Sequence, residues 1–201
     1  DLNAVLAKAA RQLHAAGLIK GWRDELLSVG SPPVAAIERA ACRALGITTE
    51  AVHLNAYVDG DGMFVARRSA HKQIDPGRWD NLVGGMVPAG ESLLQALSRE
   101  AFEEAGLRLN TSALLTGRRF QMRRPVAEGL QSEIIHVFDA TLHGDETLVN
   151  QDGEVDAIEL RSLNELVAAV ERGEFTLESA LVIVESLTRR SATETPVGLF
   201  S

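Results

Sequence analysis

Residues 84–107 read Gly-Gly-Met-Val-Pro-Ala-Gly-Glu-Ser-Leu-Leu-Gln-Ala-Leu-Ser-Arg-Glu-Ala-Phe-Glu-Glu-Ala-Gly-Leu, and they combine a loop, a helix and a cluster of acids. The first seven of these positions hold three glycines and one proline, which is typical of a loop. From Glu91 onward no glycine or proline interrupts the run until Gly106. A run of about four turns with a glycine directly behind it predicts one helix.

The predicted helix has an apolar side and an acidic side when its residues are placed at 100° intervals. The apolar residues expected on the buried side are Leu93, Leu94, Leu97, Ala101 and Ala105. Glu100, Glu103 and Glu104 share a neighbouring arc at spacings i, i+3 and i+4, and Arg99 precedes them. Like charges at this spacing repel each other by roughly a few tenths of a kcal/mol. The repulsion grows where an apolar stripe keeps water away.

Three acids on one helix face allow two interpretations. In the first, they form a solvated surface with no further role. In the second, a hard divalent cation relieves their repulsion, since Mg²⁺ takes oxygen ligands and combines a few carboxylates with substrate phosphates. The glycine-rich loop, and the spacing of Glu91, Arg99 and Gly106 around the acids, favour the second interpretation.

This stretch resembles the Nudix box, whose pattern is G-x5-E-x7-R-E-U-x-E-E-x-G-U, where U is an aliphatic residue. The matching positions are Gly85, Glu91, Arg99, Glu100, Glu103, Glu104, Gly106 and Leu107. Ala101 stands at the first U position and is smaller than the usual residue there. Eight matches within 23 residues make the resemblance to the Nudix, or MutT-type, hydrolases specific.

The resemblance implies a metal centre that holds Mg²⁺ or Mn²⁺. Carried over residue by residue, Glu103 and Glu104 would be primary ligands. Glu100 would be a further ligand or would handle the proton of a water molecule, and the backbone carbonyl of Gly85 would complete the shell. A bound metal neutralises phosphate charge and lowers the pKa of a bound water, which suits cleavage of a diphosphate.

Four acidic or basic residues around this core have supporting roles in the same resemblance. Arg99 and Glu91 are expected to orient the acids through a salt bridge rather than touch the substrate. Members of the family often recruit one acid from outside the box. Glu133 at the mouth of a predicted strand is the first candidate, and Glu154 is the second. Both can equally be ordinary surface acids at strand ends.

Basic residues precede the box in a chain that is acidic overall. Arg67, Arg68 and Lys72 are three cations within six residues, a grouping that suits the binding of a diphosphate. Arg68 and Lys72 are the preferred candidates, since Arg67 is expected to point to the other face of its strand. Trp79 follows in the same loop, where it would either stack on a heteroaromatic ring of the substrate or pack the loop against the core.

Length and composition narrow the classes of partner. The 201 residues are 45% hydrophobic and 24% charged, which indicates an ordinary globular protein of one domain with an extension. A net charge of −8 without a long basic run argues against nucleic acid and anionic membranes as partners. No apolar run approaches a membrane span, and no signal peptide is visible. Cys42 is the single cysteine, expected to be buried and inert, which fits a reducing cytoplasm.

Strand and helix patterns follow one another without a regular βαβ order, which predicts an α+β layered domain. Helices are predicted at 3–16, 34–45, 91–105, 162–171 and 177–189, and strands at 26–29, 51–58, 63–67, 113–123, 133–142 and 154–160. The Nudix resemblance implies the specific form, a mixed sheet sandwiched between helices. We expect an N-terminal extension at 1–48, a Nudix domain at 49–190 and a tail at 191–201. The extension could form a homodimer surface or a lid.

A narrower resemblance concerns two Nudix subgroups. The approach to the box, with Arg68 and Lys72, is similar to that of isopentenyl-diphosphate isomerase. That enzyme needs a catalytic Cys and a metal-binding His in the stretch where this sequence has Gly84 and Met86, so we do not expect the isomerase reaction.

The other subgroup is related to the Nudix domain of fungal thiamine pyrophosphokinase. The segments that resemble it include 21–25, 38–41, 52–58, 66–69, 152–155 and 179–182. This resemblance implies hydrolysis of thiamine diphosphate, or of its oxo and oxy analogues, to the monophosphate and phosphate. Two alternatives remain open, a hydrolase of nucleoside diphosphate derivatives (a nucleotide sugar or an oxidised nucleotide) and a ligand sensor with a Nudix fold and no turnover.

Overall fold

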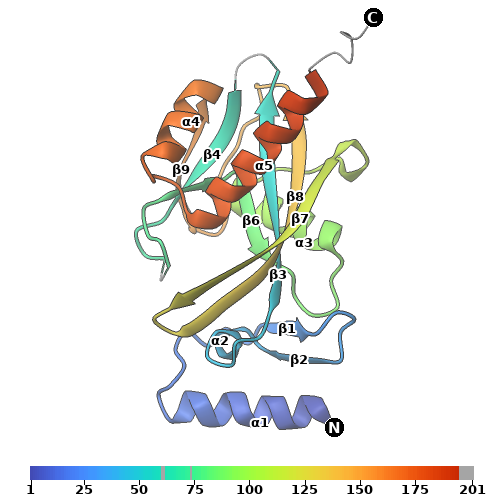
Figure 1. Ribbon diagram of the computed structural model, residues 1–201, viewed down its shortest axis with the longest axis vertical. Helices are drawn as coiled ribbons and strands as arrows, with labels where there is room; N and C mark the ends of the chain where they lie inside the picture. Colours follow the sequence, from blue (N-terminus) through green and yellow to red (C-terminus); the bar gives the residue numbers. More distant parts are fainter. Residues whose placement is uncertain (60–61, 73, 195–201) are drawn as a thin grey trace, which may run out of the picture. The chain divides into compact units, whose positions relative to one another are not determined.

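The computed structural model describes residues 1–59, 62–72 and 74–194 of the chain (Figure 1). The helices are α1 (Leu2–Ala15), α2 (Arg39–Cys42), α3 (Leu93–Ala105), α4 (Leu163–Glu171) and α5 (Leu177–Glu194), with a 3-10 turn η1 (Thr111–Ala113). The strands are β1 (Leu26–Val29), β2 (Ala35–Glu38), β3 (Thr49–Val58), β4 (Gly62–Arg68), β5 (Trp79–Asn81), β6 (Val83–Met86), β7 (Leu115–Val126), β8 (Gly129–Leu142) and β9 (Val155–Arg161).

The strands and helices form an α+β fold with a mixed sheet, which confirms the predicted fold class. Among the described residues, seven strands belong to one sheet of order β5-β4-β3-β8-β7, in which β6 also pairs with β3 and β9 with β4. A separate two-stranded sheet joins β1 and β2. None of the described helices is both long enough and apolar enough to cross a membrane.

The chain forms two compact units, each assembled from segments that are far apart in the sequence. Unit 1 comprises Asp1–Val52, Gly85–Ala96 and Arg119–His136. Unit 2 comprises His53–Gly84, Leu97–Arg118 and the described residues from Val137 onward. The boundaries fall inside β3, β6, β7, β8 and α3, so these elements contribute residues to both units. The predicted division at residue 48 stays a prediction.

Unit 1 has a hydrophobic core of its own. Helix α1 begins at Asp1, whose side chain accepts the N–H of Asn3 at 3.1 Å, a helix cap that the sequence pattern allows. Strands β1 and β2 pair antiparallel with Leu27 opposite Ile37. The buried residues that pack together are Ala10, Ile19, Leu27, Ile37, Ala41 and Cys42. The predicted N-terminal extension is therefore folded, and Cys42 is a buried thiol as expected.

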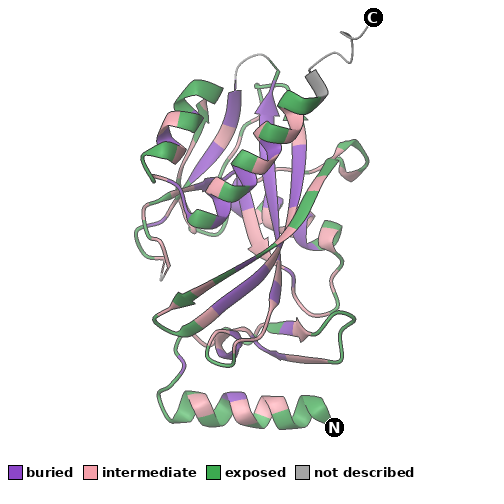
Figure 2. Ribbon diagram, viewed as in Figure 1, coloured by how far each residue is buried: buried purple, intermediate pink, exposed green. Residues whose placement is uncertain are grey.

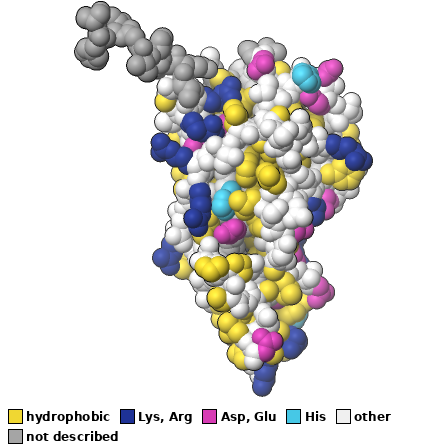
Figure 3. All heavy atoms as spheres, turned by 90° about the vertical axis from the view of Figure 1, so that its right-hand side faces the viewer, with side chains coloured by type: hydrophobic (Ala, Val, Ile, Leu, Met, Phe, Trp, Pro, Cys, Tyr) yellow, Lys and Arg dark blue, Asp and Glu magenta, His cyan; other side chains and the backbone are white. Residues whose placement is uncertain are grey.

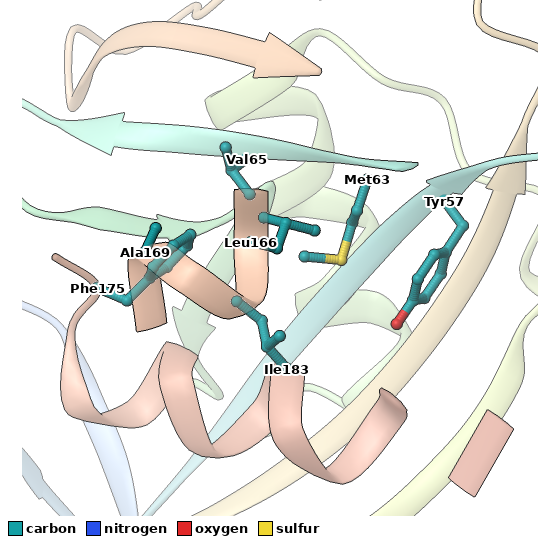
Figure 4. Close-up of a cluster of buried hydrophobic side chains, with 7 residues drawn as sticks. All are labelled: Tyr57, Met63, Val65, Leu166, Ala169, Phe175 and Ile183. Atoms are coloured by element: carbon teal, nitrogen blue, oxygen red, sulfur yellow. The ribbon is translucent and has the colours of Figure 1, made fainter. Parts of the chain in front are cut away.

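The core of unit 2 lies between the sheet and two helices (Figure 4). Strand β4 pairs with β9 antiparallel, and α4 begins with a capping box in which Ser162 and Glu165 exchange hydrogen bonds. The buried side chains of this cluster are Tyr57, Met63, Val65, Leu166, Ala169, Phe175 and Ile183. They come from β3, β4, α4, α5 and the α4–α5 connection, so both C-terminal helices pack against the same sheet face.

Strand β3 is the most deeply buried strand in Figure 2, and β4 is buried along most of its length. Strand alternation puts His53, Asn55 and Tyr57 on one face of β3 and Leu54 and Ala56 on the other, and all five are buried. By contrast β7 is mostly exposed or half-buried. On the face drawn in Figure 3, basic, acidic and hydrophobic side chains are interspersed with uncharged ones.

The helix predicted at 34–45 is wrong. Residues Ala35–Glu38 form strand β2, and only Arg39–Cys42 are helical. Pairing with β1 satisfies the backbone of this segment and buries Ile37 completely, so a long-range partner outweighs the helix propensity of its alanines.

The buried face of α3 differs from the predicted one. Leu94 is 42% exposed and Leu93 is half-buried, whereas Ala96 is completely buried and Glu104 is only 7% exposed. The buried positions are Ala96, Leu97, Ala101, Glu104 and Ala105. The buried face of α3 thus includes one of the acids, Glu104, because the surroundings that pack against the helix change along its length.

Two other boundaries also move. Strand β7 runs through Pro125 to Val126, beyond the predicted end at residue 123, since Pro is tolerated on the edge strand of a sheet. Helix α5 continues to Glu194, inside the predicted tail. The rest of that tail, 195–201, lies outside the described residues.

Candidate functional site

The loop before α3 forms a tight turn that sets the start of the helix. Gly90 has a φ angle of +92°, a left-handed conformation that suits glycine. The N–H of Glu91 donates to the carbonyl of Pro88 at 3.1 Å. Ser92 and Gln95 then exchange side-chain-to-backbone hydrogen bonds at 2.8 and 3.3 Å, which form a capping box.

One arginine holds two of the three box acids in unit 2. Nη1 of Arg99 donates to Oε1 of Glu100 and to Oε2 of Glu103, each at 3.0 Å. Glu100 is the more buried of the two carboxylates. The positive charge of Arg99 offsets the repulsion between the acids, and this geometry supports the orienting role predicted for it.

Glu104 is the buried acid of the site. Its Oε2 accepts the N–H of Gly84 at 2.9 Å. Burial raises the pKa of Glu104 well above its usual value, and the negative charge of Glu100 raises it further. The hydrogen bond from Gly84 and the charge of Lys72 act in the opposite direction but do not cancel the effect. Burial is therefore the main reason that the charged form of Glu104 is disfavoured.

The contact between Gly84 and Glu104 is favoured by a glycine. A Cβ atom at residue 84 would lie 3.0 Å from Nδ1 of His53, a tight contact that the imidazole would have to relieve by shifting. The backbone of β6 can thus approach β3 closely and still present its N–H to Glu104. This is one physical reason for the glycine pair at the start of the loop.

Glu104 lines a small cavity in unit 2 together with the predicted diphosphate clamp. The lining residues are Ala66, Arg68, Lys72, Asp80, Asn81, Gly84, Glu104, Glu154 and Val155. The cavity has a volume of about 10 Å³, close to the space that one water molecule needs. The fold therefore brings together four of the predicted residues, Arg68, Lys72, Glu104 and Glu154.

Both cations of this cavity are paired with acids. Nη1 of Arg68 donates to Oδ2 of Asp80 at 3.0 Å, and its Nε and Nη2 donate to the carbonyl of Ile74. Lys72 forms an ion pair with Glu154. The lining holds two bases against three carboxylates, a formal charge of 2 − 3 = −1 when all are ionised. A diphosphate would be repelled here unless further positive charge is supplied.

Two predicted substrate residues lie away from this cavity. Arg67 is exposed, and its Nε donates to the carbonyl of Gly77 at 3.2 Å. Trp79 packs against the hydrophobic cluster of unit 2, and the guanidinium of Arg161 lies 3.7 Å from the centroid of its ring. Of the two roles considered for Trp79, this placement favours packing, and its contact with a substrate stays a prediction.

The remaining predicted residues belong to unit 1. Gly85 and Glu91 lie in the loop before α3, and Glu133 lies on β8. Glu133 is buried rather than on the surface, and its Oε1 accepts a hydrogen bond from Nε2 of Gln131 at 2.9 Å. The roles of all three at a metal centre stay predictions.

The donor set of α3 fits a divalent cation chemically, because a buried carboxylate lies next to a like charge. Within residues 1–59, 62–72 and 74–194, however, no three His, Cys, Asp or Glu side chains form a group ready to hold a metal ion. Glu100 and Glu103 are turned toward Arg99. Metal binding would therefore require at least one of them to leave Arg99 and turn toward Glu104.

The sequence analysis did not predict a series of hydrogen bonds between buried polar side chains, which leads away from the cavity. Nδ1 of His53 bonds to Oδ1 of Asn81 at 3.0 Å, and Nδ2 of Asn81 donates to Asn55 at 2.7 Å. Asn55 donates to Asp139 at 3.0 Å, and Asp139 accepts from Arg189 of α5 at 2.7 Å. The signal was the alternation of polar residues at 53 and 55 in an otherwise apolar strand. These hydrogen bonds hold the side chain of Asn81 in place at the cavity wall.

Comparison with known proteins agrees with this geometry. The family model described as the NUDIX domain matches residues 49–181. A curated relative, Nudix hydrolase 24, chloroplastic, from Arabidopsis thaliana, is 32% identical over 208 aligned positions that cover 94% of this chain and 54% of the relative. The chain spans 53% to 61% of the length of the three curated relatives that it matches over nearly its whole extent.

Solved structures share the fold. The crystal structure of DR0079 from Deinococcus radiodurans has a TM-score of 0.62 and 22% identity, and covers 83% of this chain and 98% of its own. A bifunctional NMN adenylyltransferase/ADP ribose pyrophosphatase from Francisella tularensis, complexed with AMP and a Mn ion, has a TM-score of 0.53 and 20% identity. It covers 71% of this chain and 42% of its own.

Proposed function

The chain belongs to the Nudix family, and we propose that it is a Mg²⁺- or Mn²⁺-dependent hydrolase that cleaves a diphosphate linkage. The observation that carries the proposal is Glu104, a buried carboxylate beside Glu100 in a cavity whose formal charge is −1. Such a carboxylate destabilises the fold unless a cation joins it. A buried carboxylate at this position is explained if the cation takes part in the activity.

In this proposal Glu104, Glu103 and Glu100 hold the metal. When bound, the metal would neutralise phosphate charge and lower the pKa of a coordinated water. The N–H of Gly84 holds Glu104 in one orientation. Arg99 keeps Glu100 and Glu103 together in the absence of the metal. The roles of Gly85 and Glu133 as further ligands, and of Glu91 as a supporting residue, stay predictions.

Arg68 and Lys72 bind the diphosphate in this proposal, because both line the cavity that contains Glu104. Each has to exchange its present acid partner, Asp80 or Glu154, for a phosphate oxygen. Each exchange leaves a carboxylate without its present cation, which has a cost unless the metal or a proton compensates it. Arg67 and Trp79 are assigned weaker roles at the rim, since neither lines the cavity.

For the organic group of the substrate we favour thiamine diphosphate or its oxo and oxy analogues, with the monophosphate and phosphate as products. The support is the order of short motifs along residues 20–190 that resemble the thiamine pyrophosphokinase-related subgroup. Nucleoside diphosphate derivatives are the second candidate, because one neighbour in fold is an ADP ribose pyrophosphatase complexed with AMP.

The test is phosphate release from thiamine diphosphate, its oxo and oxy analogues, ADP-ribose and common nucleotides. Each substrate is assayed with Mg²⁺, with Mn²⁺ and with EDTA. We expect turnover that EDTA abolishes and that Glu104→Gln reduces strongly. Glu171→Gln, an exposed acid at the end of α4, is the matched control and should retain full activity.

The outcomes separate the candidates. Preference for the thiamine compounds supports the narrow substrate, and preference for ADP-ribose or nucleotides keeps the chemistry but discards the subgroup. No turnover of any compound, with ligand binding unchanged in Glu103→Gln and Glu104→Gln, would overturn the hydrolase and favour a Nudix-fold sensor.

The cellular location and the partners of the protein are also proposals. A cytoplasmic location rests on the single buried Cys42 and competes with the chloroplast named for the Arabidopsis relative. The partners proposed are a small-molecule diphosphate and a second copy of the chain through residues 1–48, without nucleic acid or membrane. Imaging of a tagged full-length protein and light scattering with the purified chain test these two points.

A further inference from the structure

Unit 1 contains a cavity that is large enough for a small organic molecule. Its volume is about 640 Å³, within the range of about 300–1,000 Å³ that is usual for ligand pockets. All of its lining residues belong to unit 1, and none of them is Glu100, Glu103 or Glu104. The cavity therefore belongs to unit 1 and shares no lining residue with the cavity beside Glu104.

Four segments that are distant in the sequence build its wall. The turn between β1 and β2, the start of β3, the loop before α3 and the paired strands β7 and β8 each contribute residues. Backbone hydrogen bonds tie them together, from Val87 N–H to the carbonyl of Glu50 at 2.9 Å and from Ala89 N–H to that of Leu26 at 2.8 Å. A wall held by backbone bonds keeps its shape when the site is empty, which lowers the entropic cost of binding.

The turn that borders the cavity is also well defined. Gly30 has a φ angle of +86°, and a Cβ atom there would lie 3.2 Å from the carbonyl oxygen of Pro32. The N–H of Val34 closes the turn on the carbonyl of Val29 at 2.9 Å. The N-terminal extension thus presents a fixed rim rather than an open loop.

The lining combines an apolar body with acids and uncharged polar groups. Val29, Ile47, Val87 and Ile134 supply apolar surface, and Glu50 and Glu91 supply the carboxylates. None of the described lining residues is Lys, Arg or His. A molecule that fills the cavity meets the carboxylate of Glu50, and no described lining residue brings a positive charge to it, so an anionic ligand is disfavoured.

The negative charge of the cavity includes that of Glu50, which lies next to His136. Nε2 of His136 lies 3.5 Å from Oε2 of Glu50. Burial lowers the pKa of His136, and the charge of Arg119 lowers it further, while Glu50 acts in the opposite direction. The lowered pKa disfavours the charged imidazole beside the carboxylate of Glu50.

We propose that this cavity of unit 1 binds a small organic cation, a one- or two-ring molecule with a positive charge or amino donors directed to Glu50. The apolar walls would take the ring, and the hydroxyl and amide groups of Thr48 and Gln121 would offer further hydrogen bonds. The inference goes beyond the proposed hydrolysis and does not depend on it. The same chemistry could belong to the organic part of the substrate or to a separate effector.

The test measures binding of probes to the full chain by isothermal titration calorimetry in EDTA, so that metal binding and turnover do not contribute. Benzamidine and thiamine are the cationic probes, and benzoate is the anion of matched size. We expect the two cations to bind and benzoate not to bind. Glu50→Gln should weaken cation binding at least tenfold, and Ser28→Trp, which fills the cavity from its rim, should abolish it.

Two controls use acids outside the cavity. Glu128→Gln lies on the exposed β7–β8 turn, and Glu104→Gln removes the buried acid of unit 2, so both should bind the probes as the wild type does. Circular dichroism confirms that the variants are folded, and Glu50→Gln alone decides the question if Ser28→Trp does not fold. Failure of both cations to bind, or binding that neither Glu50→Gln nor Ser28→Trp weakens, would overturn the proposal.

A second arm identifies the source of the cation when the protein turns over a substrate of the panel. If Ser28→Trp raises KM at least tenfold with unchanged kcat, the cavity holds the organic group of the substrate. If KM is unchanged while probe binding is lost, the cavity serves a separate ligand. Binding is read without metal, so a failure of the hydrolase proposal leaves this result intact.

Discussion

In unit 1 a cavity of about 640 Å³ contains acids and no base, whereas in unit 2 the cavity beside Glu104 measures about 10 Å³ and contains two ion pairs. The first has space, and none of its described lining residues is Lys, Arg or His. In the second the charged side chains already form ion pairs, and there is little space. A ligand can therefore enter unit 1 without rearrangement, but binding in unit 2 has to exchange Arg68–Asp80 and Lys72–Glu154 contacts first.

The difference suggests how the two parts are stabilised. In unit 2 the ion pairs hold the clamp closed, and Glu104 remains as the group whose charge is not balanced. In unit 1 backbone hydrogen bonds hold the wall, and Val29 and Ile47 of its lining also pack against the hydrophobic core.

The largest expected effect is on turnover. Glu104→Gln should lower kcat by about 10²- to 10³-fold, the range seen when one group that stabilises a transition state is removed. The same change should raise the free energy of unfolding by about 1 kcal/mol in EDTA, since a neutral amide replaces a buried charge and can still accept the N–H of Gly84. Phosphate release and thermal melts measure the two changes.

Glu171→Gln is the control for both readings, because that carboxylate is exposed. A gain of 1 kcal/mol corresponds to about 2–4 °C in melting temperature for a chain of this size. Loss of stability in Glu104→Gln together with full activity would mean that Glu104 is a structural residue.

The second prediction concerns the two hydrophobic cores. Leu166→Ala in unit 2 and Ile37→Ala in unit 1 each delete a completely buried side chain, so each should lower the free energy of unfolding by about 2–5 kcal/mol. Urea unfolding followed by far-ultraviolet circular dichroism measures the loss.

The rate at which Cys42 is alkylated reports whether unit 1 opens. It lies in the core of unit 1, and burial, aided by Glu38, raises the pKa of its thiol to about 12, so alkylation at pH 8 should be slow in the folded protein. If Ile37→Ala accelerates labelling and Leu166→Ala does not, the units unfold separately. Equal acceleration by both variants would show that they unfold as one cooperative body.

A smaller effect is expected at the clamp. Lys72→Met should raise KM for the diphosphate substrate by about tenfold with kcat nearly unchanged, because it removes a phosphate-binding charge outside the reacting centre. Lys8→Met, an exposed lysine of α1, is the matched control. An unchanged KM in Lys72→Met would assign Lys72 to the ion pair with Glu154 alone.

The smallest effect concerns pH and the wall of unit 1. His136 has a lowered pKa in the folded protein, so the unfolded chain binds its proton first as pH falls below about 6.5. Its contribution to stability is complete above that pH and is lost as pH falls toward the folded-state pKa. Glu50 and Arg119 are the charged groups that act on it.

His136→Gln should therefore reduce the loss of stability between pH 7 and pH 5 by about 1 kcal/mol or less. Denaturant unfolding at several pH values measures this slope, and His14→Gln on α1 is the control because it leaves the cavity of unit 1 unaltered. An identical slope in wild type and His136→Gln would show that folding does not lower the pKa of His136.

Much of the local structure was predictable because it depends on neighbours in the chain. The glycine loop and capping residues locate α3, and alternation locates β3, so both elements appear where the pattern puts them. The segment 34–45 failed because its alanines favour a helix, while β1 offers it a strand partner and a place for Ile37. Leu94 failed because the packing around α3 changes between its first and last turns.

The residue pattern alone was enough for family membership and for the chemical type of the site, since the spacing of Glu100, Glu103 and Glu104 on one helix is a local property. Only the folded chain decided which acid is buried and that Lys72 pairs with Glu154, 82 residues away. The same holds for the cavity of unit 1, whose wall comes from four distant segments. Burial and charge balance depend on long-range contacts, and a local period contains no information about them.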